Sequence, residues 1–132
     1  MKDKIKEKLI TKATAARENA YVPYSEFPVG AAVLTAQGEI YTGCNVENSS
    51  YGLCNCAERT AIFKSVSEGD KDIEAIAVVA DTDGPCSPCG ACRQVIMEFG
   101  PEIDVIMTNL NGDTIVKQAN ELLWGAFSGD DL

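Results

Sequence analysis

The run Ile73–Ala80, with the sequence IEAIAVVA, is the feature that most constrains the fold of this chain. It is apolar almost without interruption, which is typical of a strand that is buried on both faces of a sheet. Such a sheet needs helices packed on its faces, so the run favours an α/β fold. A chain of 132 residues is long enough for one domain of this kind, which we expect to span residues 1–132.

Hydrophobic spacing and turn residues place the other elements around this strand. Apolar side chains recur at near-helical spacing from Ile5 to Ala20 until Pro23 ends the helix, and Gly38 and Asn111-Gly112 mark turns. The sequence predicts helices over residues 3–20, 56–68 and 89–99, strands over residues 29–35, 39–44, 73–80, 103–108 and 114–117, a loop over residues 45–55, and a last short turn capped by Asn120. This order is typical of one mixed sheet with helices on its faces.

Composition restricts the chemistry, because the chain holds six cysteines and no histidine. Ser-His-Asp triads, Cys–His nucleophiles, histidine acid–base catalysis and HExxH zinc sites are all excluded. Catalysis must then use carboxylates, thiolates, a metal or a cofactor.

The net charge of -9 is unevenly distributed: the first 17 residues hold six bases and two acids, and the rest holds five bases and 18 acids. We interpret the basic start as the solvated face of a helix, rather than a polyanion-binding arm. The acidic remainder argues against nucleic acid as a partner. Neither a membrane span nor a signal peptide is expected, so the chain is predicted to be cytoplasmic. In that compartment, six cysteines indicate free thiols, a metal site or redox chemistry rather than structural disulfides.

Two cysteine-rich segments, residues 54–59 and 86–92, lie where a loop enters a predicted helix. Free N–H groups and the helix dipole favour thiolate over thiol at such a position. Cys89 and Cys92 share one face of the first helical turn and can bind one tetrahedral Zn²⁺. A third thiolate from the other segment would leave one position open, which is the catalytic pattern, whereas four ligands would be structural.

Glu58 lies two residues beyond Cys56, so it can stand beside the metal without binding it and act as a base on water. Three thiolates make such a site negatively charged, which weakens the Lewis acid. Arg59, hydrogen-bonded to a sulfur atom, would withdraw charge and restore the acidity of the water.

Each of these features also has a simpler interpretation. A loop and a Cys-x-x-Cys pair that opens a helix are also typical of thioredoxin-like redox proteins. Glu58 and Arg59 could be a solvated pair on a helix. Cys44, Cys54 and Cys86 could be inert buried thiols, or Cys54 or Cys86 could complete a structural four-thiolate site.

Together, the two cysteine segments resemble the signature of the zinc nucleobase and nucleoside deaminases, H-x-E with P-C-x-x-C, in which cysteine can replace the histidine. Over nearly the whole chain the sequence is similar to the small homotetrameric cytidine deaminases. The similar segments are residues 27–32 (FPVGAA), 43–48 (GCNVEN), 54–61 (CNCAERTA), 87–94 (SPCGACRQ), 121–123 (ELL) and 125–127 (GAF).

This resemblance implies a three-layer α/β/α fold around a five-stranded mixed sheet. It implies a cytoplasmic enzyme of pyrimidine salvage that hydrolyses cytidine and deoxycytidine to uridine and deoxyuridine, with release of ammonia. It assigns one Zn²⁺ per chain to Cys56, Cys89 and Cys92. It also makes Glu58 the proton shuttle between water, N3 of the cytosine and the leaving amine, and Arg59 a hydrogen-bond donor to the ligand thiolates.

The resemblance also implies substrate contacts. Asn45 and Glu47 are expected to hold the ribose 3′-hydroxyl, and Phe27 to line the base pocket. The backbone of Ala57 and Cys89 is expected to contact the edge of the base.

Further contacts are expected to cross between subunits of a homotetramer with shared active sites. The residues concerned are Ser49, Tyr51 and Phe127. One departure lies nearby: the family usually has proline before Gly-Ala-Phe, whereas this chain has Trp124, which does not fix the turn.

Other functions stay open on sequence grounds. The first is deamination of another aminated heterocycle, such as a nucleoside antibiotic, although a ribose-binding pair at Asn45 and Glu47 argues against it. The others are a thiol–disulfide oxidoreductase and a non-catalytic zinc-binding module.

Overall fold

The computed structural model describes residues 2–132, and five of its segments form one mixed sheet in the order β2-β1-β3-β4-β5. The strands are β1 (Val29–Thr35), β2 (Ile40–Cys44), β3 (Ile73–Ala80), β4 (Asp104–Asn109) and β5 (Thr114–Gln118). β3 and β4 are parallel, and the other neighbouring pairs are antiparallel.

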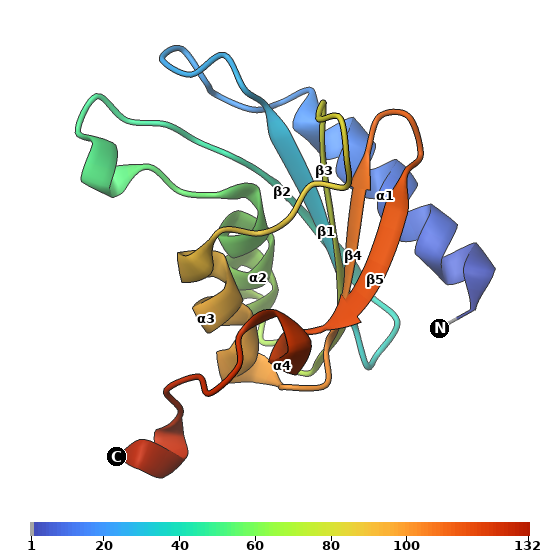
Figure 1. The fold of residues 1–132 in the computed structure, drawn as a ribbon, viewed down its shortest axis with the longest axis vertical. Helices are drawn as coiled ribbons and strands as arrows, with labels where there is room; N and C mark the ends of the chain where they lie inside the picture. The colour runs from blue at the N-terminus through green and yellow to red at the C-terminus, as the bar shows by residue number, and fades with distance from the viewer. Residues whose placement is uncertain (1) are drawn as a thin grey trace.

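Helices cover both faces of this sheet, as Figure 1 shows. On one face lies α1 (Asp3–Arg17); on the other lie α2 (Ala57–Ser67) and α3 (Gly90–Phe99), with the short α4 (Ala119–Leu122) following β5. The expected three-layer α/β/α fold with a five-stranded mixed sheet is therefore confirmed.

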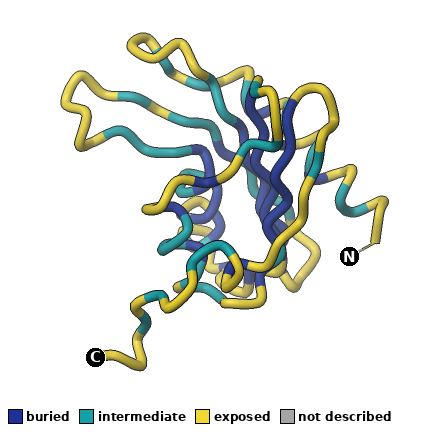
Figure 2. The backbone as a smooth tube through the Cα atoms, in the orientation of Figure 1, coloured by how far each residue is buried: buried dark blue, intermediate teal, exposed yellow. Residues whose placement is uncertain are grey.

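The central strand is buried on both faces, as its apolar run predicts (Figure 2). Ala75, Ala77 and Val79 pack in the hydrophobic core shared with α1. Ile76 and Val78 pack in the second core, which α2 and α3 complete. Alternate residues of one strand thus hold two layers of helices against the same sheet.

Several predicted boundaries are wrong by one to three residues. The first helix ends at Arg17 rather than at residue 20, because residues 18–20 turn more tightly: the backbone N–H of Ala20 donates to the oxygen of Arg17 at 3.1 Å. The N–H of Tyr21 then bonds to the oxygen of Asn45 at 3.0 Å, which draws the chain toward the loop after β2. The strand predicted over residues 103–108 lies one residue later.

The expected cap at Asn120 is also wrong. Gln118 caps α4 in a reciprocal arrangement with Glu121, and Asn120 lies inside the helix. The N–H of Asn120 donates instead to the oxygen of Pro101 at 2.9 Å, a tertiary contact that local sequence does not reveal.

Candidate functional site

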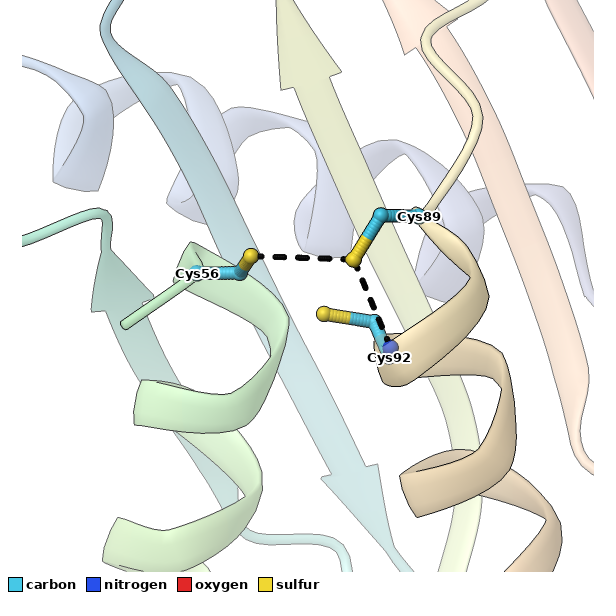
Figure 3. Close-up of side chains that lie close together, drawn as sticks. All are labelled: Cys56, Cys89 and Cys92. Atoms are coloured by element: carbon cyan, nitrogen blue, oxygen red, sulfur yellow. Dashed lines mark hydrogen bonds between the residues drawn. The ribbon is translucent and has the colours of Figure 1, made fainter. Parts of the chain in front are cut away.

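Three cysteines meet where α2 and α3 begin, as Figure 3 shows. Cys56 and Cys89 are the N-cap residues of the two helices, and Cys92 lies in the first turn of α3. Their sulfur atoms all lie within 4.8 Å of one another, and those of Cys56 and Cys89 are 3.8 Å apart. Tetrahedral Zn²⁺ with Zn–S bonds of about 2.3 Å needs sulfur atoms about 3.8 Å apart, so the cluster fits this ion.

The cluster has three members, which matches the open pattern of a catalytic zinc site. Within residues 2–132, neither Cys54 nor Cys86 belongs to it, so the four-thiolate alternative is not supported. Two elements far apart in sequence each contribute a helix start, where the backbone itself favours thiolates.

Hydrogen bonds to the Cys56 sulfur favour its thiolate form. The Cys92 thiol and the Arg59 guanidinium donate to its sulfur and lower the Cys56 pKa to about 5, against the effect of burial. The Nη2 atom of Arg59 lies 3.2 Å from that sulfur, and the same contact raises the Arg59 pKa. Cys92 shows the opposite shift: its pKa is raised by the hydrogen bond to Cys56 and by burial. Arg59 is therefore bound to the cluster rather than solvated.

Glu58 follows Cys56 in the first turn of α2 and is only 4% exposed. Burial raises the pKa of its carboxyl group to about 7, and the neighbouring Cys56 thiolate raises it as well. Because its side chain is buried, Glu58 is not a solvated glutamate on a helix surface, and that alternative is wrong.

A cavity of about 350 Å³ joins these groups to residues from the first half of the chain. It brings together most of the predicted site residues, namely Phe27, Asn45, Glu47, Cys56, Ala57, Glu58 and Cys89. Ser49, Tyr51 and Phe127 do not line it; they are exposed on this chain, Tyr51 by 75% and Phe127 by 59%. A larger hollow of about 500 Å³ beside α1 contains neither thiols nor a buried carboxylate and lies away from this chemistry.

The amide of Asn45, which lines the cavity, is held by backbone atoms of Phe27 and Val29. Its Nδ2 donates to the oxygen of Phe27 at 2.9 Å, and its Oδ1 accepts from the N–H of Val29 at 2.8 Å. Glu47 accepts hydrogen bonds from Tyr24 and Ser25, and the Ser25 hydroxyl lowers the pKa of its carboxyl group.

Sequence reasoning missed Ser25 as part of the cavity lining and left the role of Cys86 open. Cys86 lies three residues before Cys89, and this spacing is the one feature of the sequence that places it near the site. Burial and the nearby Glu58 raise the pKa of the Cys86 thiol to about 11, so it stays neutral. Cys44, Cys54 and Cys86 are partly buried, which agrees only in part with their interpretation as buried thiols.

Within the described part of the chain, no disulfide joins any of the six cysteines. Over residues 2–132, no helix has the length and hydrophobicity needed to cross a bilayer.

Comparisons with known proteins agree with this geometry. Residues 3–108 match the family model described as the cytidine and deoxycytidylate deaminase zinc-binding region. The chain is 61% identical to a cytidine deaminase of Sporosarcina psychrophila, covering 96% of this chain and 93% of that protein. It is 56% identical to a cytidine deaminase of Halalkalibacterium halodurans, covering 96% and 97%.

The fold has a similar solved counterpart. A crystal structure of cytidine deaminase from Burkholderia pseudomallei superimposes with a TM-score of 0.91 at 54% identity, covering 96% of this chain and all of that one.

Proposed function

This chain belongs to the family with the cytidine and deoxycytidylate deaminase zinc-binding region, and on that premise we propose that it hydrolyses cytidine and deoxycytidine to uridine and deoxyuridine, releasing ammonia. One observation carries the proposal: three clustered cysteine sulfurs and the buried Glu58 belong to one site beside a nucleoside-sized cavity. The names of the relatives support the same activity.

Cys56, Cys89 and Cys92 would hold the zinc ion. When bound, zinc supplies the Lewis acidity that makes a water molecule nucleophilic near neutral pH. Arg59 donates to the Cys56 sulfur at 3.2 Å and so offsets part of the negative charge of three thiolates.

Glu58 is proposed to move the protons. A carboxyl group with a pKa of about 7 is populated in both forms near neutral pH, so it can serve as base and then as acid. It accepts a proton from the attacking water and delivers it to N3 of the cytosine ring. Glu58 then helps to move the second proton of the attacking water to the amino group, which leaves C4 as ammonia while the water oxygen stays as the 4-oxo group.

The substrate contacts follow from the lining of the cavity. Phe27 lies where it can pack on the base, the backbone at Ala57 and Cys89 can meet its edge, and Asn45 and Glu47 can hold the ribose 3′-hydroxyl. The acidic surface suits a neutral nucleoside better than a phosphorylated or polymeric substrate.

The residues that would act across subunits, the assembly, the domain bounds and the cellular location are also proposals. We assign Ser49, Tyr51 and Phe127 to the site of a neighbouring subunit in a homotetramer, since the two aromatic side chains are exposed on one chain. Residues 1–132 would act as one deaminase domain in cytoplasmic pyrimidine salvage, without nucleic acid or membrane as a partner. Six free thiols suit a reducing compartment.

The test measures zinc per chain and then follows the ultraviolet absorbance of cytidine with the zinc-loaded protein. About one zinc ion per chain and conversion to uridine are expected. Bound zinc without loss of cytidine would overturn the proposed reaction. Turnover of another aminated heterocycle in place of cytidine would support the alternative substrate class.

A further inference from the structure

We propose that Ser25 is a positioning residue for nucleoside binding: its hydroxyl ties the Glu47 carboxylate to the backbone of Phe27 and so aims that carboxylate at the ribose 3′-hydroxyl. The inference rests on the proposed function and deepens it, because it names what prepares the ribose-binding group. Neither residue type nor spacing in the sequence indicates this role.

Glu47 receives three hydrogen bonds from the segment before β1. Its Oε1 accepts from the backbone N–H groups of Tyr24 at 3.0 Å and Ser25 at 3.1 Å, and its Oε2 accepts from the Ser25 hydroxyl. A carboxylate offers about four acceptor positions in all. Three are therefore used to orient the group, and about one remains for a substrate hydroxyl.

The Ser25 hydroxyl also joins Glu47 to the other two substrate residues. While it donates to Glu47, it accepts from the N–H of Phe27 at 3.1 Å, which uses the donor and one acceptor position of a serine. The oxygen of Phe27 accepts from Asn45 Nδ2 at 2.9 Å. One hydroxyl thus connects the residues proposed to contact the base and the ribose.

The backbone at this turn is strained. Glu26, between Ser25 and Phe27, has φ of 56°, and it is the sole non-glycine residue with positive φ in the described chain. Left-handed backbone of this kind persists only where surrounding contacts hold it, and it is concentrated at ligand sites. Here the hydrogen bonds through Ser25 are among the contacts that hold it.

A second cavity beside Glu47 explains why the carboxylate needs a hydrogen bond from Ser25 to hold its orientation. Glu47 lines the site cavity and also a second cavity of about 330 Å³, which it shares with Tyr24, Ser25, Tyr51 and Cys54. Without the Ser25 hydroxyl, the carboxylate could turn into this second cavity. The Ser25 hydroxyl also lowers the pKa of the Glu47 carboxyl group, as expected of a donor directed at the carboxylate.

The test compares steady-state kinetics for cytidine and for 3′-deoxycytidine, which lacks the hydroxyl that Glu47 would bind. Ser25→Ala is expected to raise KM for cytidine by roughly 10- to 100-fold, the usual effect of losing a hydrogen bond to a charged group, with kcat changed by less than about 3-fold. KM for 3′-deoxycytidine should rise by a much smaller factor than KM for cytidine, because that substrate loses only the support that Ser25 gives to the backbone of Phe27. Ser25→Thr retains the hydroxyl and should restore binding of cytidine.

The matched control is Ser67→Ala, which removes an exposed serine at the end of α2. It should leave both substrates unaffected. Ser25→Cys serves as a second variant, because it keeps the size of serine but has a weak donor. It should raise KM for cytidine to an intermediate value even if Ser25→Ala does not fold.

The outcomes separate the two proposals. An unchanged KM for cytidine in Ser25→Ala or Ser25→Cys would overturn the positioning role. An equal rise in KM for cytidine and for 3′-deoxycytidine would overturn it as well. If the zinc-loaded wild-type protein does not consume cytidine, the proposed function fails, and the role of Ser25 fails with it.

Discussion

At the scale of single residues, two carboxyl groups of one cavity have opposite properties because their surroundings differ. Glu58 is buried at the start of α2, and burial raises its pKa to about 7. Glu47 stands at the accessible side, and hydrogen bonds from Ser25 and Tyr24 lower its pKa. A pair of carboxyl groups whose pKa values are pushed apart is typical of divided roles, here proton transfer and substrate binding.

Replacing Glu58 tests the proton-transfer role directly. Glu58→Gln keeps the shape of the side chain but cannot accept a proton, so we expect zinc to stay bound while kcat falls by about 10²- to 10⁴-fold. Metal analysis and cytidine kinetics on the same preparation check this. A variant with a near-normal kcat would show that another group moves the protons.

Arg59 tests whether charge at the sulfur atoms matters for turnover. Arg59→Ala removes the donor 3.2 Å from Cys56, so the site becomes more negative, and we expect zinc to be retained and kcat to fall by about 10-fold or more. Lys64→Ala, which removes an exposed base from the same helix, is the control and should have no effect. Equal rates for Arg59→Ala and the control would rule out charge compensation.

At the scale of elements, the close approach of α1 to the sheet depends on a residue without a side chain. A Cβ atom on Gly30 in β1 would lie 1.9 Å from the oxygen of Ala13 and 2.8 Å from the nitrogen of Arg17. Both are backbone atoms of α1, so neither can move without moving the helix.

Gly30→Ala is therefore expected to lower the free energy of unfolding by about 1–3 kcal/mol or more, as overpacking in a core does. Denaturant titration measures this loss. Gly129→Ala is the matched control, because a Cβ atom there meets nothing within 4 Å. If both variants unfold at the same denaturant concentration, the contact between α1 and β1 is looser than the structure indicates.

At the scale of the whole molecule, large side chains of the C-terminal segment are exposed on one chain. Trp124 is 93% exposed and Phe127 59%. Exposed aromatic residues of this kind are typical of interfaces, which supports the proposed homotetramer. We expect a solution mass of four times 14.1 kDa, measured by light scattering, and a mass of one chain would contradict it.

Shared active sites are tested by mixing variants. Phe127→Ala should lower activity if Phe127 completes a neighbour's site. Refolding this variant together with Glu58→Gln should then restore part of the activity, because some sites combine an intact Glu58 with an intact Phe127 from another chain. Activity no greater than the sum of the separate variants would show that Phe127 acts elsewhere.

Much of the fold was predictable because its signals are local. The run Ile73–Ala80 is apolar at nearly every position, and it has the predicted strand bounds with two layers of helices around it. Spacing placed Cys89 and Cys92 at one helix start. Helix and strand ends were less predictable, since contacts such as that of Asn120 with Pro101 depend on distant residues.

The sequence by itself determined the α/β class, the exclusion of histidine chemistry and the residue types available for a zinc site, because these follow from periodicity and composition. Only the tertiary structure decided that Cys56 meets Cys89 with their sulfurs 3.8 Å apart, that Glu58 is buried, and that Ser25 reaches Glu47. Those properties depend on segments from 22 to 33 residues apart being brought together, and on the loss of water around a charge, which no local pattern records.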